Sequence, residues 1–215
     1  SKGSTHLDHA EDLVLLYGKE GAKIASETIM KFIKKFEKNA EDTSDLTMSE
    51  KIDGSPSLYF GTSPDSQFFI GTKGVLSKGE QKIAYSLNDI RKLYQGGVEN
   101  VLAQAFNTLR PAFHEKGYAC QGDLLWYEKS GKSESTIEGK QLLTFQPNTI
   151  LYGIPVDTKS DVYKKANKAV LGIVIHGVYE THFVDGERIE FTRQGVDKVR
   201  DFADKLNQNP NVFAI

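Results

Sequence analysis

Apolar and polar positions change their spacing near residue 45, and this change divides the chain into two regions. Between residues 7 and 38, apolar side chains recur every three or four positions, as in the series Ile29, Phe32, Ile33 and Phe36. This period is typical of amphipathic helices. A polar segment follows at 39–45. We therefore predict an N-terminal helical extension over residues 1–45 and a second domain over residues 46–215.

Residues 46–215 contain mostly the short apolar runs that are typical of β-strands. We expect strands within 46–60, 67–74, 118–127, 142–156, 171–179 and 181–189. We expect helices over 86–116, 157–169 and 194–206, with Ser86 at a helix start, and a polar loop at 128–140. Because the strands follow one another as hairpins, they indicate an antiparallel sheet. The predicted fold class is α+β, with helices flanking the sheet.

The composition is that of a globular protein of ordinary polarity. Of 215 residues, 39% are hydrophobic and 26% are charged, and the net charge is −2. A nucleic acid would therefore have to bind a local basic patch. No apolar run approaches the roughly 20 residues of a membrane span, no secretory pattern begins the chain, and Cys120 is the single cysteine. We expect no membrane association and a cytoplasmic location.

Lys51 is the residue with the clearest candidate chemistry. It ends an expected strand, and Asp53-Gly54 supplies a sharp turn before the next one. A lysine amine attacks phosphorus only when it is neutral, a state that burial or a nearby cation favours. Asp53 could contact a ribose or help to hold a metal. The same residues also fit a surface lysine beside an ordinary hairpin turn.

Lys51-Ile52-Asp53-Gly54 resembles the Lys-x-Asp-Gly signature of the covalent nucleotidyltransferases, which include DNA ligases, RNA ligases and mRNA capping enzymes. The resemblance extends over about Glu50 to Glu180 and is closest to ligase-like proteins of tailed bacteriophages, which implies the host cytoplasm. It implies a curved antiparallel sheet and an ATP-dependent polynucleotide ligase in which Lys51 forms a covalent lysyl-AMP. It also implies ATP and Mg²⁺ as cofactors and a nucleic acid with a 5′-phosphate as partner. Nucleotide binding is then expected at Glu50, Ile52, Asp53 and Gly54.

Two further elements resemble parts of the same family. Thr72-Lys73-Gly74 is similar to an element whose cation contacts the nucleotide, so the resemblance gives Lys73 this role. An ordinary lysine–glycine turn explains the same residues. Gly122-Asp123 is similar to a Gly-Glu strand end whose carboxylate faces the nucleotide or its metal, so Asp123 joins Asp53 as a predicted metal ligand. The alternative for Asp123 is an edge-strand residue that points to solvent.

The apolar strand at 171–179 stands where the family has a base-stacking aromatic residue. His176 occupies this strand. It could stack on the base or lie near phosphate, and we predict that it binds nucleotide. A histidine buried in the core is the alternative. Tyr152 and Tyr179 are further candidates for stacking.

Two later elements of the family, a Glu-Gly strand and a Lys-x-Lys strand, are missing after Tyr179. We expect the chain to be the N-terminal part of a longer enzyme, incomplete at its C-terminus, because the sequence stops abruptly at Ile215. The alternatives are a reduced relative that binds a nucleotide without transferring it and a capping-type guanylyltransferase that uses GTP.

Overall fold

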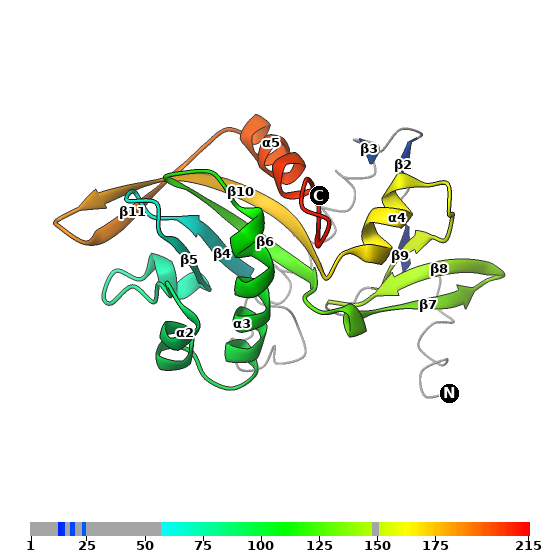
Figure 1. Ribbon diagram of the computed structural model, residues 1–215, viewed down its shortest axis with the longest axis horizontal. Helices are drawn as coiled ribbons and strands as arrows, with labels where there is room; N and C mark the ends of the chain where they lie inside the picture. Colours follow the sequence, from blue (N-terminus) through cyan, green and yellow to red (C-terminus); the bar gives the residue numbers. More distant parts are fainter. Residues whose placement is uncertain (1–12, 16–17, 20–22, 25–56, 148–150) are drawn as a thin grey trace.

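The computed structural model describes residues 13–15, 18–19, 23–24, 57–147 and 151–215. These residues form helices and mainly antiparallel strands, arranged as a six-stranded sheet, a four-stranded sheet and a two-stranded sheet, with helices beside them (Figure 1). The predicted α+β fold class is therefore confirmed. None of the described helices has both the length and the apolar character that a membrane span requires.

The larger sheet has six strands in the order β11-β10-β6-β4-β5, with β12 paired to β10. Its strands are β4 (Ser57–Thr62), β5 (Phe68–Gly71), β6 (Tyr118–Trp126), β10 (Leu171–Val184), β11 (Arg188–Arg193) and β12 (Val212–Ala214). Only β10 and β12 run parallel among these pairs. Asp185 and Gly186 join β10 to β11 with φ values of 49° and 93°, which confirms the predicted hairpin turn.

Helices pack against one face of this sheet. They are α2 (Leu87–Leu93), α3 (Gly97–Leu109) and α5 (Val196–Leu206), with short 3₁₀ turns η4 (Lys73–Leu76) and η5 (Arg110–Ala112). The Ser86 side chain accepts a hydrogen bond from the Asp89 N–H and caps α2, as predicted. Phe60 of β4 and Leu102 of α3 belong to the same buried cluster. This first core holds the helices on the sheet.

The smaller sheet has four strands in the order β1-β9-β8-β7. Its strands are β1 (Leu13–Leu15), β7 (Lys132–Ile137), β8 (Lys140–Phe145) and β9 (Leu151–Pro155), with helix α4 (Asp161–Lys168) beside them and a 3₁₀ turn η6 (Lys129–Gly131) before β7. A second buried cluster joins this sheet to the larger one, because Trp126 of β6 and Val174 of β10 belong to it. The Trp126 ring stacks on that of Phe213, with centroids 5.7 Å apart.

Two predictions of secondary structure are wrong. Helices were expected between residues 7 and 38, but the described residues there form β1, β2 (Gly18–Lys19) and β3 (Lys23–Ile24). A short apolar run fits a helix or a strand equally well, and β1 pairs in parallel with the edge of β9. The polar loop expected at 128–140 contains β7, an edge strand whose polar side chains are mostly exposed. The rest of the predicted extension lies outside the described residues.

Candidate functional site

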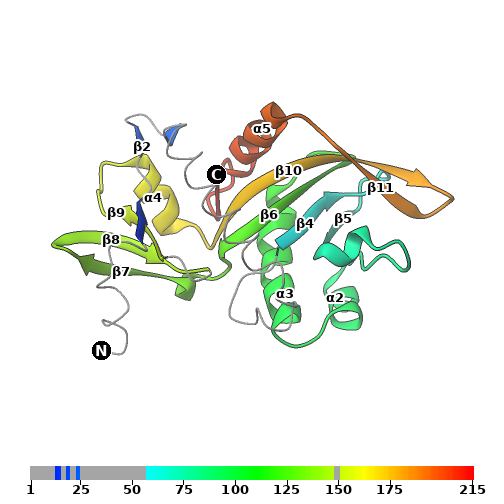
Figure 2. The ribbon, with the colours of Figure 1, turned by 180° about the vertical axis from the view of Figure 1, so that it is seen from behind.

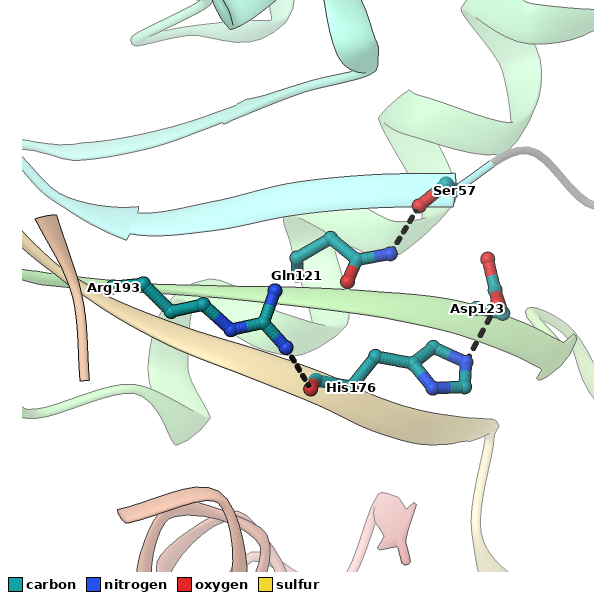
Figure 3. Close-up of polar contacts among 5 residues, drawn as sticks. All are labelled: Ser57, Gln121, Asp123, His176 and Arg193. Carbon is teal, nitrogen blue, oxygen red and sulfur yellow. Dashed lines mark hydrogen bonds and ion pairs between the residues drawn. The ribbon is translucent and has the colours of Figure 1, made fainter. Parts of the chain in front are cut away.

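The face of the larger sheet that turns away from α2 and α3 carries a group of polar and aromatic side chains. We call it the polar face and define it by Ser57, Tyr59, Gln121, Asp123, His176, Tyr179 and Arg193. Strand alternation creates it, because Cys120 and Leu124 of β6 enter the first core while Gln121 and Asp123 point the other way. Ser57 pairs with Asp123 in register, and Tyr59 pairs with Gln121. Four strands therefore contribute to one surface (Figure 3).

Asp123 and His176 form the most buried polar contact of this face. His176 Nε2 lies 2.7 Å from Asp123 Oδ2, and the side chains are only 8% and 12% exposed for histidine and aspartate. A buried carboxylate is costly unless a partner compensates it. His176 is that partner among the described residues, so the alternative of a solvent-facing Asp123 is wrong.

A β-bulge brings His176 to this position. The register between β10 and β6 shifts between Ile175 and Gly177, so that His176 is the extra residue. Ile175 and Val178 both enter the first core, which leaves His176 and Gly177 together on the polar face. A side chain at Gly177 would meet the Tyr179 ring at about 3.3 Å. The bulge and the glycine together make room for an imidazole and a phenol on neighbouring positions.

Ser57 and Gln121 extend the polar contacts to the start of β4. Gln121 Nε2 donates a hydrogen bond to Ser57 Oγ at 2.6 Å. Gln121 is half-buried, and its register partner on β10 is Gly177, next to His176. The amide, the carboxylate and the imidazole therefore lie on adjacent positions of β6 and β10, beside the first residue of β4 (Figure 3).

Aromatic rings continue the polar face toward β11. The rings of Tyr59 and Tyr179 have centroids 6.3 Å apart, and Phe191 meets Tyr179 edge-on at 6.3 Å. Burial raises the pKa of Tyr59 to about 12, helped by the nearby Tyr179 and Asp123, while Arg193 acts in the opposite direction. The Tyr59 hydroxyl thus stays protonated at neutral pH, between a carboxylate and a guanidinium.

Arg193 ends β11 and reaches back across the polar face. Its guanidinium lies 6.0 Å from the centre of the Tyr179 ring, and Nη2 donates a long hydrogen bond of 3.5 Å to the His176 carbonyl. The side chain is exposed. It forms no ion pair with a carboxylate of the described part of the chain. Arg193 therefore brings an accessible positive charge to the same surface as Asp123 and His176.

The structure brings together two of the predicted site residues, Asp123 and His176. Lys73 lies exposed on η4, and no hydrogen bond or ion pair joins it to the described residues of the polar face. The predicted residues Glu50, Lys51, Ile52, Asp53 and Gly54 lie outside the described residues. Their predicted roles therefore stay predictions.

The two tyrosines considered for stacking differ in their surroundings. Tyr152 is fully buried in the second core, where it stacks on Phe145 with centroids 5.7 Å apart. It has no surface to offer a base, so this candidate is wrong. Tyr179 is half-buried on the polar face. It remains a candidate there.

The described residues fit Mg²⁺ only in part. They contain no group of three or more His, Cys, Asp and Glu side chains that could hold a metal ion. Mg²⁺ prefers oxygen ligands, and in nucleotide sites one or two carboxylates and the substrate phosphates hold it. Asp123 supplies one such carboxylate. That is compatible with a metal brought by the nucleotide, and the predicted second ligand, Asp53, lies outside the described residues.

Sequence reasoning missed Ser57, Tyr59, Gln121 and Arg193 as members of this surface. The sequence could have predicted Gln121, because strict alternation along β6 puts it on the same side as Asp123. Arg193 could not be predicted, because its place depends on the register between β10 and β11, in which it pairs with Tyr179. That register follows from the hairpin turn and cannot be inferred from β11 alone.

Comparison with known proteins gives a family but no activity. A search of curated proteins and a search of solved structures each gave no significant match. Residues 4–209, nearly the whole chain, match the family DUF6267, which is described as a family of unknown function. The chain that carries this polar face therefore belongs to the DUF6267 family.

Proposed function

We propose that this chain is an ATP-dependent, ligase-like nucleotidyltransferase that forms a covalent lysyl-AMP at Lys51. The observation that carries the proposal is that the polar face begins on the first strand that follows the Lys-x-Asp-Gly sequence in the chain. β4 begins six residues after Lys51, and its first residue, Ser57, pairs with Asp123. A six-residue peptide spans at most about 20 Å. This length is compatible with a lysine that acts beside the Asp123–His176 contact, and in this way it supports the proposal.

The polar face offers the chemical groups that a nucleotide requires. A carboxylate and an amide accept and donate hydrogen bonds to sugar hydroxyls, and a guanidinium attracts phosphate. Tyr179 supplies a half-buried ring against which a base can stack. Asp123, Gln121, Arg193 and Tyr179 provide these groups within one surface.

The proposed reaction has two steps. The neutral Nζ of Lys51 attacks the α-phosphorus of ATP, a P–N bond forms, and the bond to the β-phosphate oxygen breaks, so that pyrophosphate leaves. An oxygen of a polynucleotide 5′-phosphate then attacks the same phosphorus, the P–N bond breaks, and AMP passes to the nucleic acid. Asp123 orients the sugar or a metal-bound phosphate. Mg²⁺, held by Asp123 and the phosphates, would neutralise charge on the phosphate oxygens.

A second candidate is a protein that binds the nucleotide without transferring it. The sequence of β11, Arg188-Ile189-Glu190-Phe191-Thr192-Arg193, favours this candidate, because it contains no lysine pair where the resemblance leads us to expect one. Such a protein would use the same polar face, but no adduct would form. The two candidates differ in one measurable product.

Covalent labelling tests the proposal. The full chain is incubated with Mg²⁺ and either α-labelled ATP or α-labelled GTP, then denatured and separated by electrophoresis. Lys51→Ala is treated in the same way, beside a matched control, Lys140→Ala, at the exposed first residue of β8. We expect acid-labile label from ATP on the parent and on Lys140→Ala, and none on Lys51→Ala. Label from GTP alone would indicate a guanylyltransferase. Absence of label with both nucleotides would contradict the transfer and leave nucleotide binding without chemistry.

A further inference from the structure

The Arg193 guanidinium attracts phosphate in the proposed function, and both the nucleotide and the nucleic acid carry phosphate. Asp123 and His176 contact each other at 2.7 Å, and Gln121 and Ser57 are uncharged. Among the residues that define the polar face, Arg193 alone carries a guanidinium. We propose that Arg193 binds the polyphosphate of the nucleotide, and this inference rests on the proposed function.

The hydrogen-bonding capacity of Arg193 supports this role. A guanidinium has five N–H donors in a planar fork. Among the described residues, one of these donors makes a single contact, the 3.5 Å hydrogen bond to the His176 carbonyl, which is at the long end of the range for such bonds. No described residue accepts a hydrogen bond from the other donors, which can therefore bind oxygen atoms of a ligand. A fork of this kind fits two oxygens of one phosphate group.

The position of the guanidinium is fixed from one side. Tyr179 lies 6.0 Å from it, and the Tyr179 ring in turn covers Gly177. A cation held near an aromatic face keeps its charge while losing part of its freedom. Figure 3 shows the guanidinium reaching along the sheet toward Gln121 and the His176 backbone. Less entropy is then lost when a phosphate binds.

The surrounding charges favour a phosphate at this end of the face and a sugar at the other. The Asp123 carboxylate would repel a phosphate, but His176 contacts it and separates it from the guanidinium in Figure 3. Phe191, whose ring meets that of Tyr179 edge-on, is apolar and brings no charge to this end of the face. An anion therefore meets attraction from Arg193 with little opposing charge from the described residues that pack beside it.

Equilibrium binding tests this role. The full chain with Lys51→Ala cannot form an adduct, so its affinities for ATP, adenosine and a 5′-phosphorylated oligonucleotide report binding alone. Arg193→Gln and Arg193→Lys are compared in this background, with Arg200→Gln on the exposed side of α5 as the matched control. We expect Arg193→Gln to weaken ATP binding by at least about tenfold and to leave adenosine unchanged. Arg193→Lys should lose less, and Arg200→Gln nothing.

Several results would overturn the proposal. They are an unchanged affinity for ATP in Arg193→Gln, an equal loss for ATP and adenosine, a loss confined to the oligonucleotide, or no binding of ATP to the Lys51→Ala parent. Thermal unfolding of each variant shows whether a loss of binding comes from misfolding. Arg193→Lys is a second check, because it keeps the positive charge and the aliphatic part of the side chain. Labelling of the chain with native Lys51 is read separately. If ATP binding needs Arg193 but no label forms, only the covalent chemistry is contradicted. If label and ATP affinity are both unchanged in Arg193→Gln, only the role of Arg193 is contradicted.

Discussion

Neighbouring residues of β4 face opposite sides of the larger sheet and have opposite surroundings. Phe60 is completely buried in the first core, which also contains residues of α3, whereas Ser57 and Tyr59 face the side that carries Asp123 and Arg193. On the first side, close packing and the burial of apolar surface stabilise the fold. The other side contains the buried Asp123–His176 contact and an exposed cation, and such polar groups contribute little to stability for the desolvation they require. Polar groups in such a place point to a ligand more than to folding.

The largest difference between the two faces should appear on truncation of the packed side. Phe60 meets the Phe113 ring edge-on, with centroids 5.8 Å apart. Phe60→Ala removes this contact and leaves a cavity, so we expect the free energy of unfolding to fall by about 3–5 kcal/mol. Urea unfolding followed by circular dichroism measures this. A loss below about 1 kcal/mol would show that the sheet is not held by this core.

The buried pair of the polar face should come second. His176→Ala leaves the Asp123 carboxylate without its described partner, and we expect a loss of about 3 kcal/mol. Adding Asp123→Ala should recover part of this, with a coupling energy of about 0.5–3 kcal/mol. His182 and Glu180, an exposed pair on the same strand at 3.7 Å, provide the control, where His182→Ala should cost at most about 1 kcal/mol. Equal effects for the two histidines would remove the distinction.

The amide of the polar face should contribute less. Gln121→Ala removes the hydrogen bond to Ser57 Oγ, and we expect the free energy of unfolding to fall by about 1 kcal/mol. Ser57→Ala should cost a similar amount, and the double variant little more than either, because both remove the same bond. Urea unfolding of the three variants checks this. Strict additivity would mean that the two side chains act independently.

The smallest expected effect is a titration. The pKa of Tyr59 is raised to about 12 by burial and by Tyr179 and Asp123, above the usual value near 10. Because the folded state holds this proton more tightly than the unfolded state, the contribution is complete below pH 10 and is lost as the pH rises toward 12. Ultraviolet titration of the parent and of Tyr59→Phe should differ by one tyrosine ionising near pH 12. Arg193→Gln should raise the Tyr59 pKa further, and a fall would contradict the electrostatic account.

The sequence predicts those parts of the structure that depend on interactions between residues close together in the chain. The hairpins, the Ser86 cap and the turn at Asp185-Gly186 are correct, because alternation, capping and turn chemistry act over a few residues. The helix predicted at 13–15 and the loop predicted at 132–137 are wrong, because pairing with β9 and with β8 makes these segments strands. Short or polar segments adopt the structure that a neighbouring edge offers.

The candidate site divides in the same way. The prediction that Asp123 needs a partner follows from burial of a carboxylate in an apolar strand, but the identity of that partner does not. His176 meets Asp123 only because β10 contains a bulge. Nothing in the local sequence marks this irregularity, since Ile175, His176 and Gly177 also fit a regular strand. Arg193 depends on a register across a hairpin.

The bulge at His176 has a consequence for the parity of β10. Before it, odd-numbered residues such as Ile173 and Ile175 face the first core, and after it the even-numbered Val178 does. The one extra residue, His176, therefore decides which side chains of the β10–β11 hairpin face the first core and which face the polar side. Loss or gain of a single residue there would exchange the faces of everything beyond it, including Tyr179 and its partner on β11. Changes by two residues would preserve them. In related chains, length differences at this point should therefore come in even numbers wherever the polar face is retained.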